Sequence, residues 1–168
     1  MFMIRLSKTS MVLAMALFAT LAAFGNITDY ASNFAFVQHV FMMDTTTPGN
    51  GIMYRAIASP WVHHAGYIGI IGLEIATAFL CWVGGVQLLR ALKSDNLGFQ
   101  LAKRWAVAGL SLGFLTWQVA FMSVGGEWFG MRMSKQWNGM PDAFRFFITL
   151  LSVLIYLTLP DDRLIERD

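Results

Sequence analysis

Glu74 is the one acidic residue in the long apolar stretch 65–89. An acid at the centre of a membrane helix costs about 2.5–3.5 kcal/mol on insertion scales, so it normally faces the bundle interior or a wet cavity and often marks an ion route. One hypothesis is therefore a proton or ion conduit centred on Glu74. The alternative is a protonated Glu74 hydrogen-bonded to Ser111, Thr116 or Gln118. No Lys, Arg, Asp or His lies at mid-membrane to form a relay with Glu74. We rank the conduit last, because four helices are few for a transporter unless copies assemble.

Three histidines, His39, His63 and His64, precede that stretch and could bind a metal or haem. Histidine is the commonest ligand of transition metals. His63 and His64 diverge by about 100° on a helix, so only one of them can share a metal with His39. Asp44 or Glu127 would be a suitable third ligand. A redox protein that uses these histidines with haem or copper is one hypothesis, but capping or interfacial hydrogen bonds are the favoured interpretation.

Signatures of common soluble enzymes are missing: the chain has no Walker A loop and no HExxH motif. A catalytic site would have to be built from Glu74, Glu127, the histidines and Asp29 or Asp44, with no nucleophile–base spacing among them. The sequence therefore favours a non-enzymatic role without a cofactor and gives no catalytic residue.

The elements that carry these residues are apolar helices. Of the 168 residues, 57% are hydrophobic and 13% are charged, about half of the roughly 25% charged fraction of a soluble domain. Each long uncharged stretch approaches the roughly 20 residues that cross a bilayer. We expect an all-α fold and one domain over 1–168, a four-helix transmembrane bundle. Its predicted helices are 10–29, 65–89, 105–124 and 144–159.

Charge predicts the orientation. Eight Lys and Arg residues fall on the side of both termini and the connection 90–104, and four fall on the other side. By the positive-inside rule the termini are cytoplasmic, and the connections 30–64 and 125–143 face the periplasm of a bacterial inner membrane. A net charge of +2 without a basic run excludes nucleic acid as a partner.

The two outer connections are too apolar for solvated loops, so we expect partly helical segments that fold over the bundle. Gly125 and Gly126 are expected to end the third helix in a left-handed conformation, with Trp128 anchoring the turn. Glu127 is expected to pair with Arg55 or Arg132 and hold this outer region together.

Small residues predict close helix packing. Gly109 and Gly113 form a GxxxG match on a stripe of the third helix, and the second helix offers Gly66, Gly69 and Gly72. Internal packing is favoured over dimerisation of two copies. The single cysteine, Cys81, is expected to be a packing residue.

Several segments outside the generic apolar helices are similar to a known family. They are Asn26–Tyr30, Asn33–Val40, Met43–Thr46, Arg55–Ile57, Val124–Phe129 and Trp137–Gly139. On these segments the chain resembles the predicted small integral membrane proteins called domain of unknown function 2165. The resemblance covers nearly the whole chain and implies a bacterial four-helix inner-membrane protein. It supplies no activity, substrate or catalytic residue.

The favoured function is that of an accessory or assembly subunit. The apolar outer connections suit docking onto a larger inner-membrane complex or a second copy of the chain better than they suit an active site. The metal or haem protein and the Glu74 conduit are the alternatives. The lipid bilayer is the partner that every one of these functions shares.

Overall fold

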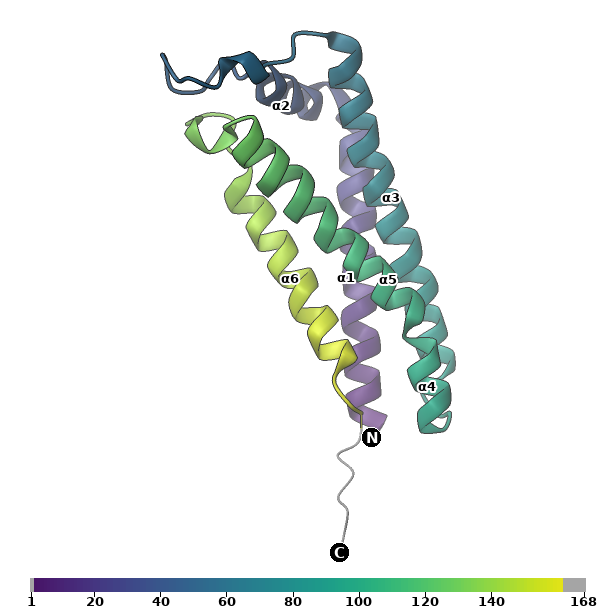
Figure 1. Ribbon diagram of the computed structural model, residues 1–168. Coiled ribbons are helices and arrows are strands. Elements are labelled where there is room, and N and C mark those ends of the chain that lie inside the picture. Colours follow the sequence, from purple (N-terminus) through teal and green to yellow (C-terminus); the bar gives the residue numbers. More distant parts are fainter. Residues whose placement is uncertain (1, 162–168) are drawn as a thin grey trace, which may run out of the picture.

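The computed structural model of the protein describes residues 2–161, and this part of the chain is helical without strands (Figure 1). Within it, four stretches are long and apolar enough to cross a membrane. They are α1 (Phe2–Thr28), α3 (Pro60–Arg90), α6 (Met140–Thr158) and a third span, Asn96–Trp128, built from α4 (Asn96–Ala102), α5 (Arg104–Leu115) and η2 (Thr116–Trp128). The predicted all-α bundle with four spans is confirmed.

The helices extend beyond their predicted bounds for local reasons. The third span begins well before residue 105 because the Asp95 side chain caps α4, accepting a hydrogen bond of 2.9 Å from the Gly98 amide. Pro60 starts α3, where its missing N–H costs nothing. α1 begins at Phe2 rather than residue 10, because Arg5 and Lys8 are buried and hydrogen-bonded inside the bundle.

α3 is the central helix of the bundle and packs against both α1 and α5 (Figure 1). α6 packs on α5 and η2. α1 begins and α6 ends at the same end of the bundle, which we call the terminal end. From there α1 and α6 diverge toward the opposite end, the cap end.

Small residues let α3 and α5 approach closely. A methyl group built on Gly109 would lie 2.7 Å from the Cys81 sulfur and 2.8 Å from the Cys81 backbone nitrogen. Gly113 faces Thr77 of α3 in the same way. The prediction that the α5 stripe packs internally is confirmed. Gly72, by contrast, has no neighbour within 4 Å of an added methyl group.

The last part of the third span is a π-helix, η2, of 13 residues. Gly125 and Gly126 lie within it and do not adopt the left-handed conformation, so the expectation that they end the helix there was wrong. Gly126 instead allows Met140, at the start of α6, to pack directly on the backbone. The left-handed glycine is Gly130, with φ 65°, after η2 has ended.

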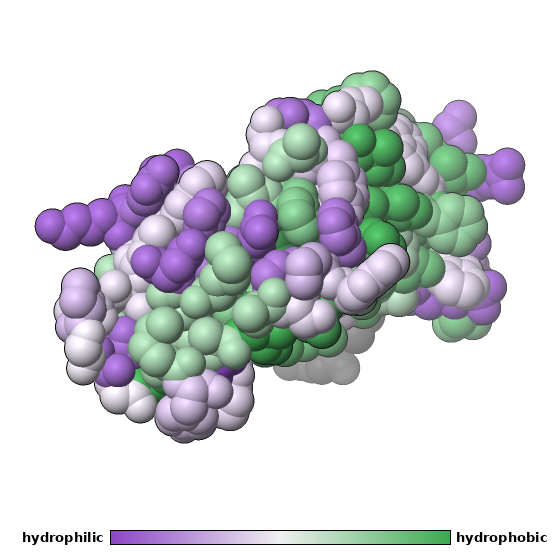
Figure 2. Space-filling model, turned by 90° about the horizontal axis from the view of Figure 1, so that it is seen from above, coloured by the Kyte–Doolittle hydropathy of each residue, from purple (hydrophilic) through white to green (hydrophobic). Residues whose placement is uncertain are grey.

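The cap (residues 29–59 and 129–139) closes one end of the bundle. It contains α2 (Tyr30–Met42), which lies across the helix ends in Figure 1, and the short helices η1 (Met53–Arg55) and η3 (Met131–Met133). Seen from above in Figure 2, hydrophilic groups are interspersed with apolar ones. The expected apolar, partly helical connections are confirmed. Trp61 and Tyr54 are exposed at this end, as aromatic residues at a membrane interface commonly are.

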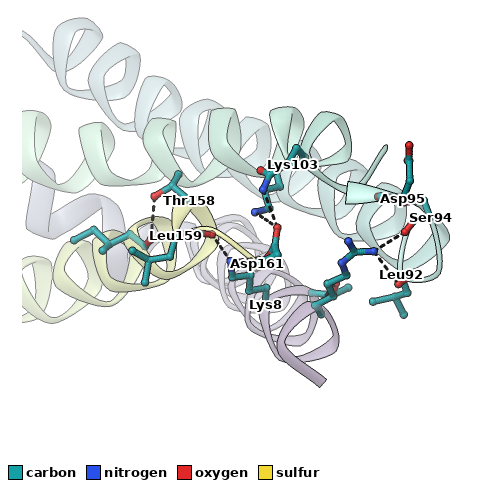
Figure 3. Close-up of polar contacts among 12 residues, drawn as sticks. Lys8, Leu92, Ser94, Asp95, Lys103, Thr158, Leu159 and Asp161 are labelled. Carbon is teal, nitrogen blue, oxygen red and sulfur yellow. Dashed lines mark hydrogen bonds and ion pairs between the residues drawn. The ribbon is translucent and has the colours of Figure 1, made fainter. Parts of the chain in front are cut away.

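At the terminal end, Lys8, Lys103 and Asp161 form a buried ion cluster (Figure 3). Each lysine lies 2.7 Å from one oxygen of the Asp161 carboxylate, whose side chain is completely buried. Lys8 also donates to the Leu159 carbonyl. Burial alone would raise the pKa of Asp161, but hydrogen bonds and positive charge from Lys103 and Lys8 outweigh it and hold the pKa of Asp161 below its usual value. The ion cluster joins α1, the third span and the end of α6.

Gly109→Ala tests the close contact of α3 with α5. The added methyl group must displace the Cys81 backbone, so we expect a loss of about 1–3 kcal/mol in the free energy of unfolding. The matched control, Gly72→Ala, adds the same group in open space and should be neutral or gain about 0.5–1 kcal/mol through helix propensity. Thermal unfolding in detergent measures both variants. Equal effects would contradict the packing described here.

Asp161→Asn tests the ion cluster. The substitution leaves two buried lysines without a counter-charge, so we expect a loss of about 3–5 kcal/mol in unfolding free energy at neutral pH. Because the folded-state pKa of Asp161 is lowered, its contribution is present above the unfolded pKa of about 3.9 and is lost as the pH falls through the folded-state pKa. The difference from the wild type should therefore shrink in acid. Asp142→Asn, at an exposed pair with Arg145, is the control and should change little.

Candidate membrane-embedded cavity

A cavity of about 370 Å³ lies beneath α2, among α1, α3, η2 and α6. Its lining residues on α1 and α6 come from the cap-end parts of these helices, which diverge toward that end (Figure 1). Leu21 of α1 and Asp142 of α6 both line it and are both exposed, so the cavity lining reaches the surface of the bundle at these two helices below the cap. Its volume is within the usual range of small-molecule sites.

Glu74 lies at the inner wall of this cavity with only 3% of its surface exposed. The Asn26 side-chain amide of α1 donates a hydrogen bond of 2.7 Å to Oε2 of Glu74. The expected alternative partners on the third span were therefore wrong. Thr116, one of them, donates to the Leu112 carbonyl within its own helix.

Tyr67 fixes the orientation of Asn26. Its hydroxyl group lies 2.9 Å from the Asn26 carbonyl oxygen, to which it donates, and 3.3 Å from the side-chain oxygen Oδ1. With Oδ1 facing the phenol, the amide nitrogen of Asn26 faces Glu74. Tyr67 is two helical turns before Glu74 on the same face of α3, and both are buried. Asn26, Tyr67 and Glu74 form the polar cluster of the cavity.

Only one oxygen of Glu74 is satisfied by the protein. Within residues 2–161, the Asn26 amide is the sole hydrogen-bond donor to this carboxyl group, through Oε2. Oε1 has no hydrogen-bond partner there. It is nevertheless not sealed from solvent. Glu74 also lines the cavity. Oε1 is therefore the oxygen that a bound molecule or water can reach.

Aromatic side chains form the other walls. Trp117 and Phe121 come from η2, Phe36 from α2 and Phe146 from α6. Trp117 packs edge-on against Phe146, with 5.7 Å between the ring centroids. The wide turns of a π-helix occur frequently at functional sites, and here η2 supplies two of the four rings.

Of the predicted metal ligands, His39 lies in α2, and His63 and His64 lie near the start of α3. The His39 ring pairs with Asp44 at 2.8 Å and stacks on Trp137. His64 stacks on Phe34, with 4.1 Å between the ring centroids.

The third histidine, His63, is buried and donates from Nε2 to the Ile57 carbonyl at 2.7 Å. Its Nδ1 atom has no partner within the described residues. Between residues 2 and 161, no group of three or more His, Cys, Asp or Glu side chains is arranged to hold a metal ion. Metal binding by the three histidines stays a prediction.

The cap residues singled out by sequence do meet one another. Arg55 donates to the Trp128 carbonyl at 3.2 Å, and its guanidinium lies over the Trp128 ring, 4.6 Å from the centroid. Glu127 pairs with Arg132 at 3.2 Å. Of the two expected partners of Glu127, the structure therefore selects Arg132, while Arg55 holds the end of η2.

The roles of Asn26, Tyr67 and the aromatic walls were not predicted from the sequence. One signal was present: Asn26 is a polar residue that follows the stretch 11–25 of α1, in which Thr20 is the one polar side chain. Such a residue needs a hydrogen-bond partner inside the bundle. A buried acid on a neighbouring helix was the natural candidate.

Comparison with known proteins places the chain in a family. Searches of the curated proteins and of the solved structures find no match to it. A family model described as predicted small integral membrane protein, domain of unknown function 2165, matches residues 4–160. This range includes all four spans and every residue of the polar cluster. The chain therefore belongs to this family of small integral membrane proteins.

Proposed function

We propose that the protein is a membrane-embedded binding protein that holds a small molecule in the cavity beneath α2. The observation that carries the proposal is Glu74, a buried acid with one oxygen held by Asn26 and the other left for the cavity. Burying an acid in a membrane is costly, and a purely structural acid would be expected to have both oxygens hydrogen-bonded. A bound molecule would supply the missing partner.

The location of the cavity suits a molecule that arrives from one side of the membrane. Positive-inside counting supports cytoplasmic termini, which would put the cap and the cavity at the periplasmic side of a bacterial inner membrane. The opening between α1 and α6 then faces the outer leaflet. A molecule could enter from the lipid without crossing the cap.

A conduit through Glu74 is less well supported than a binding site. Between the cavity and the ion cluster of the terminal end, the bundle core is mainly apolar. Cys81, Leu88 and Leu110 of this core have no exposed surface. A conducting path would need polar groups or water in that region. The haem or metal alternative would rest on His39, His63 and His64, whose ring nitrogens bond to Asp44, Ile57 and Tyr30 rather than to Glu74.

A second candidate function is that of an accessory subunit, and a groove on the side of the bundle favours it. The groove has a volume of about 520 Å³, lies between α3 and the third span, and is almost entirely apolar. Gly66 and Gly69 line it, and Gly69 has open space around it. Small residues on an open helix face suit close contact with a further transmembrane helix.

Cavity filling tests the binding function. An added methyl group at Gly25, which lines the cavity, meets no atom within 4 Å, so Gly25→Leu should project into the cavity without disturbing the fold. We expect wild-type protein purified from native membranes in mild detergent to carry a small molecule detectable by mass spectrometry, and Gly25→Leu to lose it. The control, Gly72→Leu, adds the same side chain away from the cavity and should retain the molecule. Identical small-molecule content in the two variants would contradict the proposal.

Gly69→Leu tests the accessory role, because Gly69 lines the groove. The substitution should reduce recovery of a co-purifying membrane protein in mild detergent, whereas Gly25→Leu should leave that recovery unchanged. A wild-type particle that always runs alone at its own mass would count against this second function.

A further inference from the structure

We propose that the ligand of the cavity is an amphipathic amine, with its ammonium group at Glu74 and its apolar body between the aromatic walls. This inference rests on the proposed binding function and names the chemical class of the molecule. It follows from the charge, the hydrogen-bonding capacity and the shape of the cavity lining.

The charge of the lining is acidic. The residues that line the cavity include two acids, Glu74 and Asp142, and no Lys, Arg or His. Asp142 is exposed at the opening and pairs with Arg145 at 3.2 Å, so the buried negative group is Glu74. An anionic molecule would meet this carboxyl group with no positive charge to offset it. A cation is the complementary partner, and its attraction is strongest where water is scarce.

The free oxygen of Glu74 requires a hydrogen-bond donor on the ligand. In its ionised form, which a bound cation stabilises, the carboxylate of Glu74 can only accept hydrogen bonds. Oε2 of Glu74 already accepts one from the Asn26 amide, and Oε1 is the oxygen left for the cavity. An ammonium group is both a donor and a cation, so it satisfies Oε1 and neutralises the charge with one contact.

The walls suit the rest of such a molecule. Trp117, Phe121 and Phe146 provide flat apolar surfaces for an aryl or alkyl body. Aromatic faces also attract cations within about 6 Å of the ring centroid. A molecule with one charged end and one apolar end would enter from the lipid and insert its ammonium group toward Glu74.

Three probes of one shape test the ligand class: phenylbutylamine, phenylbutanol and phenylbutyrate, which differ only in the head group. Binding is measured by the ligand-dependent shift in thermal unfolding of the full chain in detergent. A charge-assisted hydrogen bond is worth about 1.5–3 kcal/mol, so we expect the amine to bind at least about tenfold more tightly than the alcohol. Phenylbutyrate should bind most weakly of the three.

Glu74→Gln should abolish the preference for the amine while keeping the binding of phenylbutanol, which also reports that the cavity is intact. The matched control is Glu127→Gln, which removes one negative charge at an exposed pair in the cap and should keep the preference. Gly25→Leu should weaken the binding of all three probes.

The outcomes separate the two proposals. Amine preference in the wild type that is lost in Glu74→Gln supports the ligand class. A second outcome is that Gly25→Leu weakens probe binding but the wild type binds phenylbutanol or phenylbutyrate more tightly than phenylbutylamine. That result overturns the ligand class and leaves the binding function standing. If no probe shifts unfolding of the wild type more than that of Gly25→Leu, both proposals are overturned.

Discussion

Hydrocarbon offers no hydrogen-bond partner, and this constraint governs every polar side chain within the bundle. At the terminal end the constraint is met for the buried acid Asp161, because both of its oxygens accept from buried lysines and Gln100 also donates to it. At the cap end it is met only in part, because one oxygen of Glu74 has no donor among residues 2–161. The same chain that satisfies one buried acid fully leaves the other facing a cavity. This contrast is the physical basis for assigning a binding role to the cap end.

The geometry of α3 explains how both regions coexist in so small a protein. Toward the terminal end its small residues bring α5 into direct backbone contact, and no space remains between the helices. Toward the cap end, large aromatic side chains of η2 and α6 keep the neighbouring helices apart. A single helix thus forms a sealed core along one half and the wall of a cavity along the other.

The sequence was sufficient to predict the number of spans, the helical cap and the internal packing of the Gly109 stripe, because each depends on local composition or on spacing along one helix. It was not sufficient to predict the partner of Glu74. That partner depends on how α1 and α3 are rotated about their axes, and their low amphipathicity leaves the rotation undetermined. The π-helical turns of η2 were missed for a related reason. η2 packs against α6, and its first nine residues, 116–124, contain no Gly or Pro that would indicate a departure from the α-helix.

The ion cluster also constrains the order in which the protein can be assembled. Lys8 lies in the first span and its carboxylate partner follows the fourth, 153 residues later in the chain. Until α6 has been synthesised and inserted, the two lysines have no counter-charge and can remain at the aqueous interface with their ammonium groups hydrated. Arrival of Asp161 draws them into the protein and fastens the first helix to the last. Closure of the terminal end is therefore a late event in biogenesis, and it reports that all four helices are in place.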